Sequence, residues 1–291
     1  IPNFKCFGYY GGMPKLNLKN PEVEKYITDV ACYWIKECDI DGWRLDVGDE
    51  ISHFFWKNFR KAVKAVKKDM LIIGEIWHYA GDFLEGDEWD TVMNYPFYLN
   101  LIDLLADEKI NVSQFVQNLG YLKGRLNKKC YPLMWNLIDS HDTARFLHLC
   151  KDNKKKQHLA AAFQLLLPGM PMIYYGDEYA MPGANDPDCR RGMYWDEEYQ
   201  DKEMFEWYKR LIQVRKSHAC IVEGELAGSV TEDEEGTVVL IRKNGEETIA
   251  MIFNCSSSAK KFNEYTQKYN LLTENTFDGN VEGFDAAVIV L

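Results

Sequence analysis

The chain has 291 residues, of which 46% are hydrophobic and 14% aromatic, enough for one large core and a small second domain. Its 34 Lys and Arg residues against 45 Asp and Glu residues give a net charge of −11, which argues against a nucleic-acid partner because phosphates would be repelled. No apolar run approaches the length of a membrane span, so we expect no membrane partner.

The cysteine and histidine pattern bears on compartment and metal binding. The eight cysteines include no CxxC pair and no disulfide-scaffold spacing, which favours a reducing compartment. The first residues lack the charged and apolar regions of a signal peptide, although the chain begins at Ile rather than Met. We therefore expect a cytoplasmic location. The histidines form no HxH or HExxH pattern, so we expect neither a metal nor a cofactor.

The first 218 residues alternate short apolar runs with longer amphipathic stretches, as βα units do. The predicted strands are 40–46, 70–77, 90–96, 133–139 and 171–175, each followed by a helix. Five such units are too few to close an eight-stranded barrel. The pattern alone leaves open whether this α/β body is a doubly wound sheet or part of a barrel.

Four of the predicted helices carry specific sequence signals. The first opens at Asn20-Pro21-Glu22, an N-cap followed by a proline and an acid. Helices are also expected around 157–167 and 203–216, the latter with Arg215 and Lys216 in its last turn, where the helix dipole favours cations. The remaining helix should bury one apolar face formed by Ile51, Phe54, Phe55, Phe59, Ala62, Val63 and Val66.

The pattern changes after residue 218. Short alternating runs flank Asn244-Gly245, the strongest short-range signal for a β-hairpin, and the chain ends in another apolar run at 286–291. We therefore predict two domains: an α/β body at 1–218 and an antiparallel β domain at 219–291.

Three carboxylates stand near predicted strand ends, where parallel α/β folds place their working residues: Asp46, Glu75 and Asp142. Such acids repel one another unless a site needs them. Arg44 lies two residues before Asp46, so both side chains share one strand face and the guanidinium can hold a ready nucleophile ionised. Apolar neighbours around Glu75 favour a carboxyl that keeps its proton. This division of roles is typical of retaining glycosidases.

Each of these residues taken singly has a simpler interpretation. An isolated Asp at a strand end is more often a helix cap or a structural ion pair. His53, His78 and His141 are each more often satisfied polar residues than metal ligands, and Trp77 alone is more often a core residue. The three acids as a set favour a functional site.

The motifs around these acids resemble the α-amylase family, glycoside hydrolase family 13, and most closely its neopullulanase, cyclomaltodextrinase and maltogenic amylase branch. They occur in family order at 13–17, 41–50, 72–78, 92–97, 136–146 and 169–178. The resemblance implies a (β/α)8 TIM barrel followed by a C-terminal antiparallel β-sandwich. The five predicted strands would then be about strands 4 to 8 of that barrel.

The resemblance also implies roles for individual residues. Asp46 would be the nucleophile, Glu75 the general acid/base, and Asp142 the third acid, which holds sugar hydroxyls and distorts the ring. The substrate-binding residues would be Arg44, which orients the nucleophile, His141 beside the bound sugar, Glu50 and Trp77 on the acceptor side, and Asp186 and Arg190 on the donor side. Gly48-Asp49 stands where the branch more often has Ala-Asn, which bears on acceptor preference.

The family motif of the third barrel strand and the N-terminal β domain of the branch are both missing from the sequence. We therefore expect an N-terminally truncated part of a longer enzyme, whose parent the resemblance implies to be a homodimer. The implied reaction is retaining hydrolysis of α-1,4 bonds in maltooligosaccharides, cyclodextrins, pullulan or starch. Two alternatives stay open: an α-glucan transferase of the same superfamily, and a non-catalytic glucan-binding protein, which the fragment itself could be. A metal-dependent enzyme is poorly supported.

Overall fold

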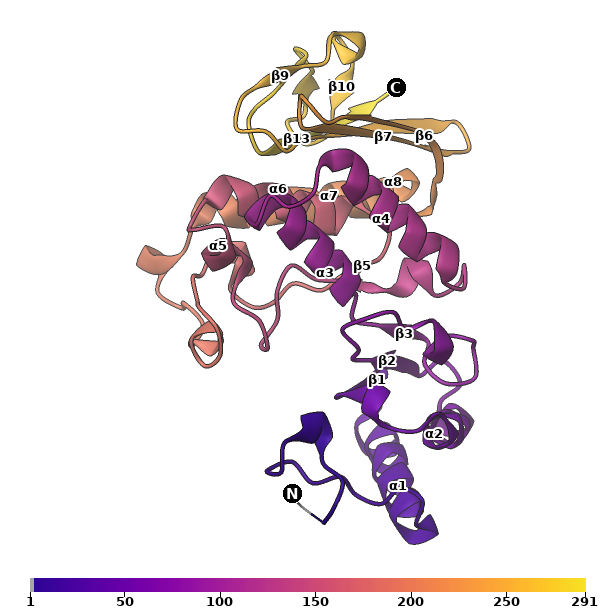
Figure 1. The fold of residues 1–291 in the computed structure, drawn as a ribbon. Coiled ribbons are helices and arrows are strands. Elements are labelled where there is room, and N and C mark those ends of the chain that lie inside the picture. The colour runs from indigo at the N-terminus through magenta and orange to yellow at the C-terminus, as the bar shows by residue number, and fades with distance from the viewer. Residues whose placement is uncertain (1–2) are drawn as a thin grey trace. The chain divides into compact units, whose positions relative to one another are not determined.

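The computed structural model describes residues 3–291, so residues 1 and 2 of the predicted body at 1–218 lie outside it. The described chain forms two compact units (Figure 1). The first unit comprises residues 3–93 and 125–134, and the second comprises 94–124 and 135–291. Within residues 3–291, no helix combines the length and apolar character needed to cross a membrane.

The first unit is built on a parallel sheet in the order β1 (Gly42–Leu45), β2 (Leu71–Gly74) and β3 (Thr91–Val92). The first three predicted strands are thus confirmed, although each is shorter than expected. Leu45 pairs with Gly74, so the next residues along the chain, Asp46 and Glu75, leave the sheet at the same edge. The register therefore places both acids side by side.

Two α-helices belong to this unit, α1 (Pro21–Cys38) and α2 (His53–Val66), together with the 3₁₀ turns η1 (Phe7–Tyr9), η2 (Gly48–Glu50), η3 (Gly81–Phe83) and η5 (Tyr131–Leu133). The predicted cap of α1 is confirmed, because the Asn20 side chain accepts a hydrogen bond from the Glu22 N–H at 2.9 Å. The predicted helix after β2 is wrong, because only η3 separates β2 from β3. Gly81 and Gly86 disfavour a helix there, and Phe83 stacks on Trp89 instead.

The predicted apolar face of α2 is partly wrong. Phe55, Phe59 and Val63 are buried as expected, but Phe54 is 68% and Val66 37% exposed, and Ile51 and Ala62 are only partly buried. Trp56 is buried in their place, and its indole N–H donates to the Gly48 carbonyl at 2.8 Å. The buried face is therefore rotated from the predicted one, because the tryptophan finds both apolar contacts and a hydrogen-bond acceptor.

The second unit begins with helices. Its elements are α3 (Tyr95–Leu101), the π-helical turn η4 (Ile102–Ala106), α4 (Val112–Arg125), β4 (Trp135–Asn136), α5 (Phe146–Leu149), α6 (Lys154–Leu166), β5 (Met170–Pro171), η6 (Asp177–Tyr179), η7 (Asp188–Arg190), η8 (Glu197–Tyr199), α7 (Lys202–Ser217) and α8 (Ala219–Glu223). The helices predicted around 157–167 and 203–216 are α6 and α7. Strands β4 and β5 pair in parallel over two residues each, far fewer than predicted. The ladder is short in part because Pro171 has no N–H to donate to it.

Helix α6 is buried on nearly all sides, and α7 secures its end. Arg215 of α7 donates to the carbonyls of Leu165 at 2.7 Å and Leu167 at 3.1 Å, and also to that of Gly169. These carbonyls lie at and beyond the C-terminus of α6, where intrahelical partners run out. The prediction that Arg215 stabilises the dipole of its own helix is therefore incomplete, because its guanidinium also caps the C-terminus of the neighbouring helix α6.

The C-terminal part of the second unit is a six-stranded antiparallel sheet with a separate two-stranded sheet beside it. The large sheet runs β11 (Asn275–Thr276), β10 (Tyr269–Asn270), β13 (Asp285–Val290), β8 (Glu247–Asn254), β7 (Thr237–Asn244) and β6 (Glu225–Glu232), and the small sheet pairs β12 (Asn280–Val281) with β9 (Lys260–Lys261), near the 3₁₀ turn η9 (Asn263–Tyr265). The predicted hairpin is confirmed with a one-residue shift, because Asn244 pairs with Glu247 and the turn residues are Gly245 and Glu246. Gly245 takes the positive φ of 60° that a tight hairpin requires.

Both faces of the central strands β7, β8 and β13 are largely buried. Val238, Leu240, Met251 and Val288 belong to the core shared with α6 and α7, where Phe163 stacks on Phe253 at 4.2 Å. The alternate residues of these strands pack instead against Phe262, Phe277 and Val281, which lie in and around the small sheet. These alternate residues are Val239, Ala250, Ile252, Ala287 and Ile289. Two β layers thus enclose a core, as expected for a β-sandwich. Since this sheet shares the core of the second unit, a domain boundary at 218–219 stays a prediction.

Candidate active site

The backbone around the two acids of the first unit is tightly fixed. The Glu75 N–H donates to the Leu45 carbonyl at 2.9 Å, and the Gly48 N–H donates to the Glu75 carbonyl at 3.1 Å. The segment after β1 is therefore tied to the segment after β2 on both sides of Glu75. Parallel strands present their carboxyl ends at one edge, which is where α/β folds gather reactive side chains.

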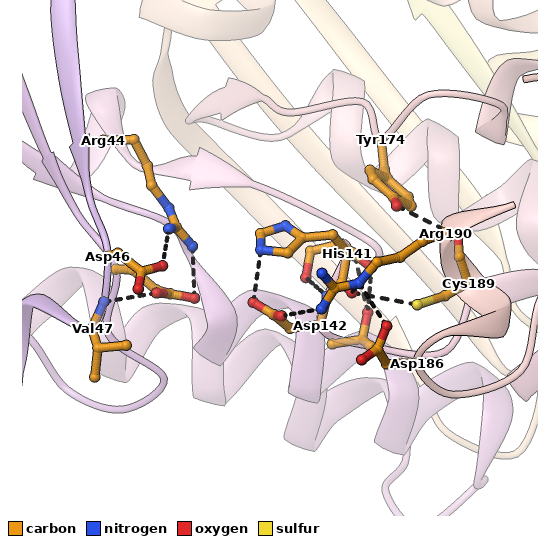
Figure 2. Close-up of polar contacts among 12 residues, drawn as sticks. Arg44, Asp46, Val47, His141, Asp142, Tyr174, Asp186, Cys189 and Arg190 are labelled. Atoms are coloured by element: carbon orange, nitrogen blue, oxygen red, sulfur yellow. Dashed lines mark hydrogen bonds and ion pairs between the residues drawn. The ribbon is translucent and has the colours of Figure 1, made fainter. Parts of the chain in front are cut away.

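One guanidinium holds both of these acids, and Figure 2 shows it beside Asp46. Nη1 of Arg44 pairs with Oδ1 of Asp46, and Nη2 pairs with Oε1 of Glu75 at 2.8 Å. The other Glu75 oxygen accepts the Val47 N–H at 2.9 Å. Glu75 is buried whereas the Asp46 side chain is 75% exposed. The prediction that Glu75 has apolar surroundings is therefore only partly right, because a cation and a backbone donor also contact its carboxyl.

Val47, directly after Asp46, has a strained backbone. Its φ of 45° and ψ of 45° lie in the left-handed region, which a β-branched residue rarely adopts. Such a conformation costs about 1–3 kcal/mol and persists only where surrounding contacts enforce it. Here the hydrogen bond from the Val47 N–H to Glu75 and the one from the Glu50 N–H to the Val47 carbonyl hold it. The strained residue thus follows one acid in the chain and is hydrogen-bonded to the other, at the point where the chain leaves β1.

The Gly48-Asp49 pair has a structural explanation. A Cβ on Gly48 would lie 2.7 Å from the ring of the buried Trp89, so no larger residue fits without movement of that ring. Asp49 forms an ion pair with Nε2 of His78 at 3.2 Å. At 48–49, where the sequence departs from the branch pattern, Trp89 therefore leaves room only for a glycine, and His78 pairs with the aspartate.

The two residues predicted on the acceptor side have different surroundings. The Glu50 carboxylate pairs with Lys15 at 2.5 Å and accepts the Gly8 N–H at 2.9 Å, and the Lys15 hydrogen bond lowers the pKa of Glu50. Glu50 thus links η2 to the motif at 13–17. Trp77 is 41% exposed. The core interpretation of Trp77 is therefore wrong.

In the second unit, Asp142 lies in a turn between β4 and α5 and is flanked by an imidazole and a guanidinium group (Figure 2). Its Oδ2 lies 3.0 Å from Nε2 of His141, and its Oδ1 lies 3.1 Å from Nη2 of Arg190. Nε of Arg190 donates to the His141 carbonyl at 2.9 Å and pairs with Asp186 at 2.7 Å. His141 and Asp142 from the motif at 136–146 thus form one connected group with Asp186 and Arg190 from a later segment.

Three further charged residues near Asp142 were missed by sequence reasoning. Asp139, Arg145 and Asp177 are all buried, and Nη1 of Arg145 lies 3.2 Å from Oδ1 of Asp177. They stand inside the motifs at 136–146 and 169–178. The available signal was the presence of charges in otherwise apolar runs, but sequence does not show that these charges meet each other.

The described residues also bear on metal binding and disulfides. Within 3–291, His, Cys, Asp and Glu side chains nowhere gather in groups of three or more that could hold a metal ion. All eight cysteines lie in this range and are free thiols. The candidate residues are thus acids, a guanidinium group and an indole in the first unit, and acids, a guanidinium group and an imidazole in the second.

Comparisons with known proteins identify the family. Residues 3–224 match the family described as alpha amylase, catalytic domain. The chain is 45% identical over 258 residues to a cyclomaltodextrinase from Geobacillus thermopakistaniensis strain MAS1, covering 89% of this chain and 44% of that protein. It is 43% identical over 253 residues to an intracellular maltogenic amylase from Bacillus subtilis, covering 87% and 43%. The chain thus spans less than half the length of these relatives.

A solved structure gives the same result. A cyclomaltodextrinase structure superposes with a TM-score of 0.93 at 35% identity, covering 99% of this chain and 52% of that one. The predicted fold class, part of a (β/α)8 barrel followed by a β-sandwich, is confirmed. The chain therefore belongs to the α-amylase family, glycoside hydrolase family 13.

Proposed function

We propose that the protein carrying this chain is a retaining hydrolase of α-1,4-linked glucans, acting on maltooligosaccharides, cyclodextrins, pullulan or starch. The observation that carries the proposal is the bridge from Arg44 to both Asp46 and Glu75. One guanidinium can contact two carboxyls only when they lie close together. Retaining glycosidases hold their acids about 5–5.5 Å apart, whereas inverting enzymes need about 6.5–9.5 Å to admit a water.

In the first step, an Asp46 oxygen attacks the anomeric carbon and forms a covalent ester with the sugar. The bond from that carbon to the leaving oxygen breaks as Glu75 gives its proton to that oxygen. The exposure of Asp46 suits a nucleophile that must reach substrate, and Arg44 holds its carboxylate in place. The buried position of Glu75 and its bond to the Val47 N–H fix the acid relative to the scissile bond.

In the second step, Glu75 takes a proton from water, and the water oxygen attacks the same carbon. The ester bond to Asp46 breaks, which restores the carboxylate, and Glu75 again carries a proton. Two inversions give net retention of configuration. If a sugar hydroxyl replaces the water, the same chemistry becomes transglycosylation.

Asp142 is proposed to bind sugar hydroxyls as the third acid, with His141 beside it. Support comes from the pairing of Asp142 with both His141 and Arg190, which leaves its carboxylate oriented from two sides. Asp186 and Arg190 are proposed to contact sugars on the donor side, and Glu50 and Trp77 on the acceptor side. Trp77 is 41% exposed, and an exposed indole is suited to stacking on a sugar ring. The proposed partner is thus a neutral glucan.

The test compares turnover of maltoheptaose by the wild-type protein with that of Asp46→Asn and Glu75→Gln. Removing the general acid/base should lower kcat about 10²–10⁴-fold, and removing the nucleophile should cost at least as much. Asp41→Asn is the matched control, because Asp41 precedes β1 and its exposed side chain pairs only with Lys67 among the ion pairs of the described chain.

Near-normal turnover in either site variant would refute the assignment. Chromatography of the products separates the two kinds of activity, since a hydrolase gives mainly short sugars whereas a transferase also gives products longer than the substrate. Binding of maltoheptaose without any wild-type turnover would instead indicate a glucan-binding protein.

A further inference from the structure

Asp142 stands on a turn whose two ends are buried charged residues. Asp139 precedes the turn and Arg145 follows it, and both are 1% exposed or less. Oδ2 of Asp139 accepts the Phe146 N–H at 2.8 Å, which closes the base of the turn. The Arg145 N–H donates to the Gly183 carbonyl at 3.0 Å. The backbone that carries His141 and Asp142 is thus fastened at both ends.

Asp177, from the segment after β5, joins these two ends. Its Oδ1 contacts Nη1 of Arg145, and its carboxyl lies close to that of Asp139. Arg145 also donates to the Tyr175 carbonyl at 2.8 Å, and its guanidinium lies over the rings of Tyr174 and Tyr175. The three side chains therefore tie the end of β4 to the end of β5.

Charge neutrality requires a proton in this cluster. Two carboxylates and one guanidinium would leave one net negative charge in the interior, which is costly. Among residues 3–291, Oδ1 of Asp139 and Oδ2 of Asp177 are buried oxygens that receive no hydrogen bond from another donor. A proton between the two carboxyls removes both problems, because it neutralises the excess charge and supplies the missing donor.

The surroundings favour Asp177 as the residue that keeps the proton. Burial raises the pKa of Asp139 to about 6, whereas burial and the neighbouring Asp139 raise the pKa of Asp177 well above its ordinary range. Other titratable or charged groups facing the pair come from α3, the turn, η6 and α7: Tyr98, Arg145, Glu178 and Tyr208. Arg145 is the cation among these four groups.

We propose that Asp139, Arg145 and Asp177 form a positioning cluster that fixes the turn carrying His141 and Asp142, with one proton shared between the two carboxyls. None of the three has to touch substrate. They act through the turn, so that Asp142 meets the sugar in one orientation. This inference rests on the proposed function insofar as Asp142 binds substrate, but the cluster and its proton can be observed without any turnover.

The experiment compares Asp177→Leu with Asp177→Asn in the purified protein. Leucine has a similar volume but cannot bond to Asp139 or Arg145, whereas asparagine keeps an N–H for Asp139 and an oxygen for Arg145. We expect Asp177→Leu to lower kcat and kcat/KM equally by about 10²-fold, as misplacement of a group that acts in the transition state does. Asp177→Asn should restore most of kcat.

Two readouts are independent of activity. The infrared carbonyl band of a protonated carboxyl should be present in the wild type at neutral pH and lost in Asp177→Asn. The NMR resonance of the His141 imidazole, assigned with His141→Gln, should keep its wild-type position in Asp177→Asn and shift in Asp177→Leu. These two measurements keep the test decisive if Asp177→Leu folds poorly, since the wild type and Asp177→Asn alone report the proton.

The inference is overturned if the wild type lacks the protonated-carboxyl band, or if Asp177→Leu leaves kcat and the His141 resonance unchanged. It is equally overturned if a folded Asp177→Asn loses as much kcat as Asp177→Leu. Absence of any glucan turnover in the wild type would refute the proposed function instead, and the band and the His141 resonance would then decide the inference alone.

Discussion

Two groups in this molecule have the same composition, two acids and one arginine, but opposite surroundings. In the first unit, Arg44 joins Asp46 to Glu75, and Asp46 is largely exposed to water. In the second, Arg145 and Asp177 are joined to Asp139, and all three are buried. Water reaches the Asp46 carboxylate of the first group, whereas the second group is enclosed by protein and has to take up a proton. Exposure, more than composition, separates a reactive acid pair from a structural one.

The largest expected difference is in stability when each arginine is lost. Arg145→Met should lower the free energy of unfolding by about 3–5 kcal/mol, because it leaves a buried acid without its cation. Arg44→Met should cost about 1–3 kcal/mol, since Glu75 keeps the Val47 N–H and Asp46 keeps water. Urea unfolding at neutral pH measures both values.

Turnover sharpens the same comparison. Arg44→Met should lose most of its kcat although it remains folded, because the nucleophile is no longer held. Equal losses of stability in the two variants would show that burial does not distinguish the two groups.

The second expected difference concerns pH. An acid whose pKa is raised in the folded state contributes stability that is fully present below the unfolded pKa and is lost as pH rises through the folded pKa. For Asp139 this window runs from near 3.8 to about 6, and for Asp177 it extends further upward. The unfolding free energy of the wild type should therefore fall relative to that of Asp177→Asn as pH rises through this range.

Chemical unfolding between about pH 4 and pH 8 measures this difference. Subtracting the two curves removes the opposite trend of acids whose pKa is lowered by ion pairs, such as Glu108 with Lys156 and Asp188 with Arg191. A difference that stays constant across the range would mean that Asp177 is ionised in the folded protein.

The smallest effect concerns the packing that supports the first group. Gly48→Ala should lower the unfolding free energy by about 1–3 kcal/mol, because the new methyl group would overlap the ring of Trp89. Gly120→Ala in α4 is the control, since a Cβ there meets nothing within 4 Å, and it should raise stability by about 0.5–1 kcal/mol. Thermal unfolding measures both, and a neutral Gly48→Ala would show that Trp89 moves freely.

Sequence reasoning succeeded where the determining interactions are local. The Asn20 cap of α1, the positions of α6 and α7, and the hairpin near Gly245 all follow from residues within a few positions of each other. Motif order carried the family assignment and the list of candidate site residues. The strand ends at Asp46 and Glu75 were found because apolar runs stop there.

Tertiary structure alone decided which side chains meet. The sequence placed Phe54 and Val66 in a core from which the fold excludes them, and it expected a helix where Phe83 stacks on Trp89. It could pair Arg44 with its near neighbour Asp46, but not with Glu75, which the parallel register of β1 and β2 brings alongside. Arg145 and Asp177 are 32 residues apart in the chain. Periodicity and capping act within one or two turns of backbone, whereas the charge state of a buried acid depends on partners that only chain folding brings within reach.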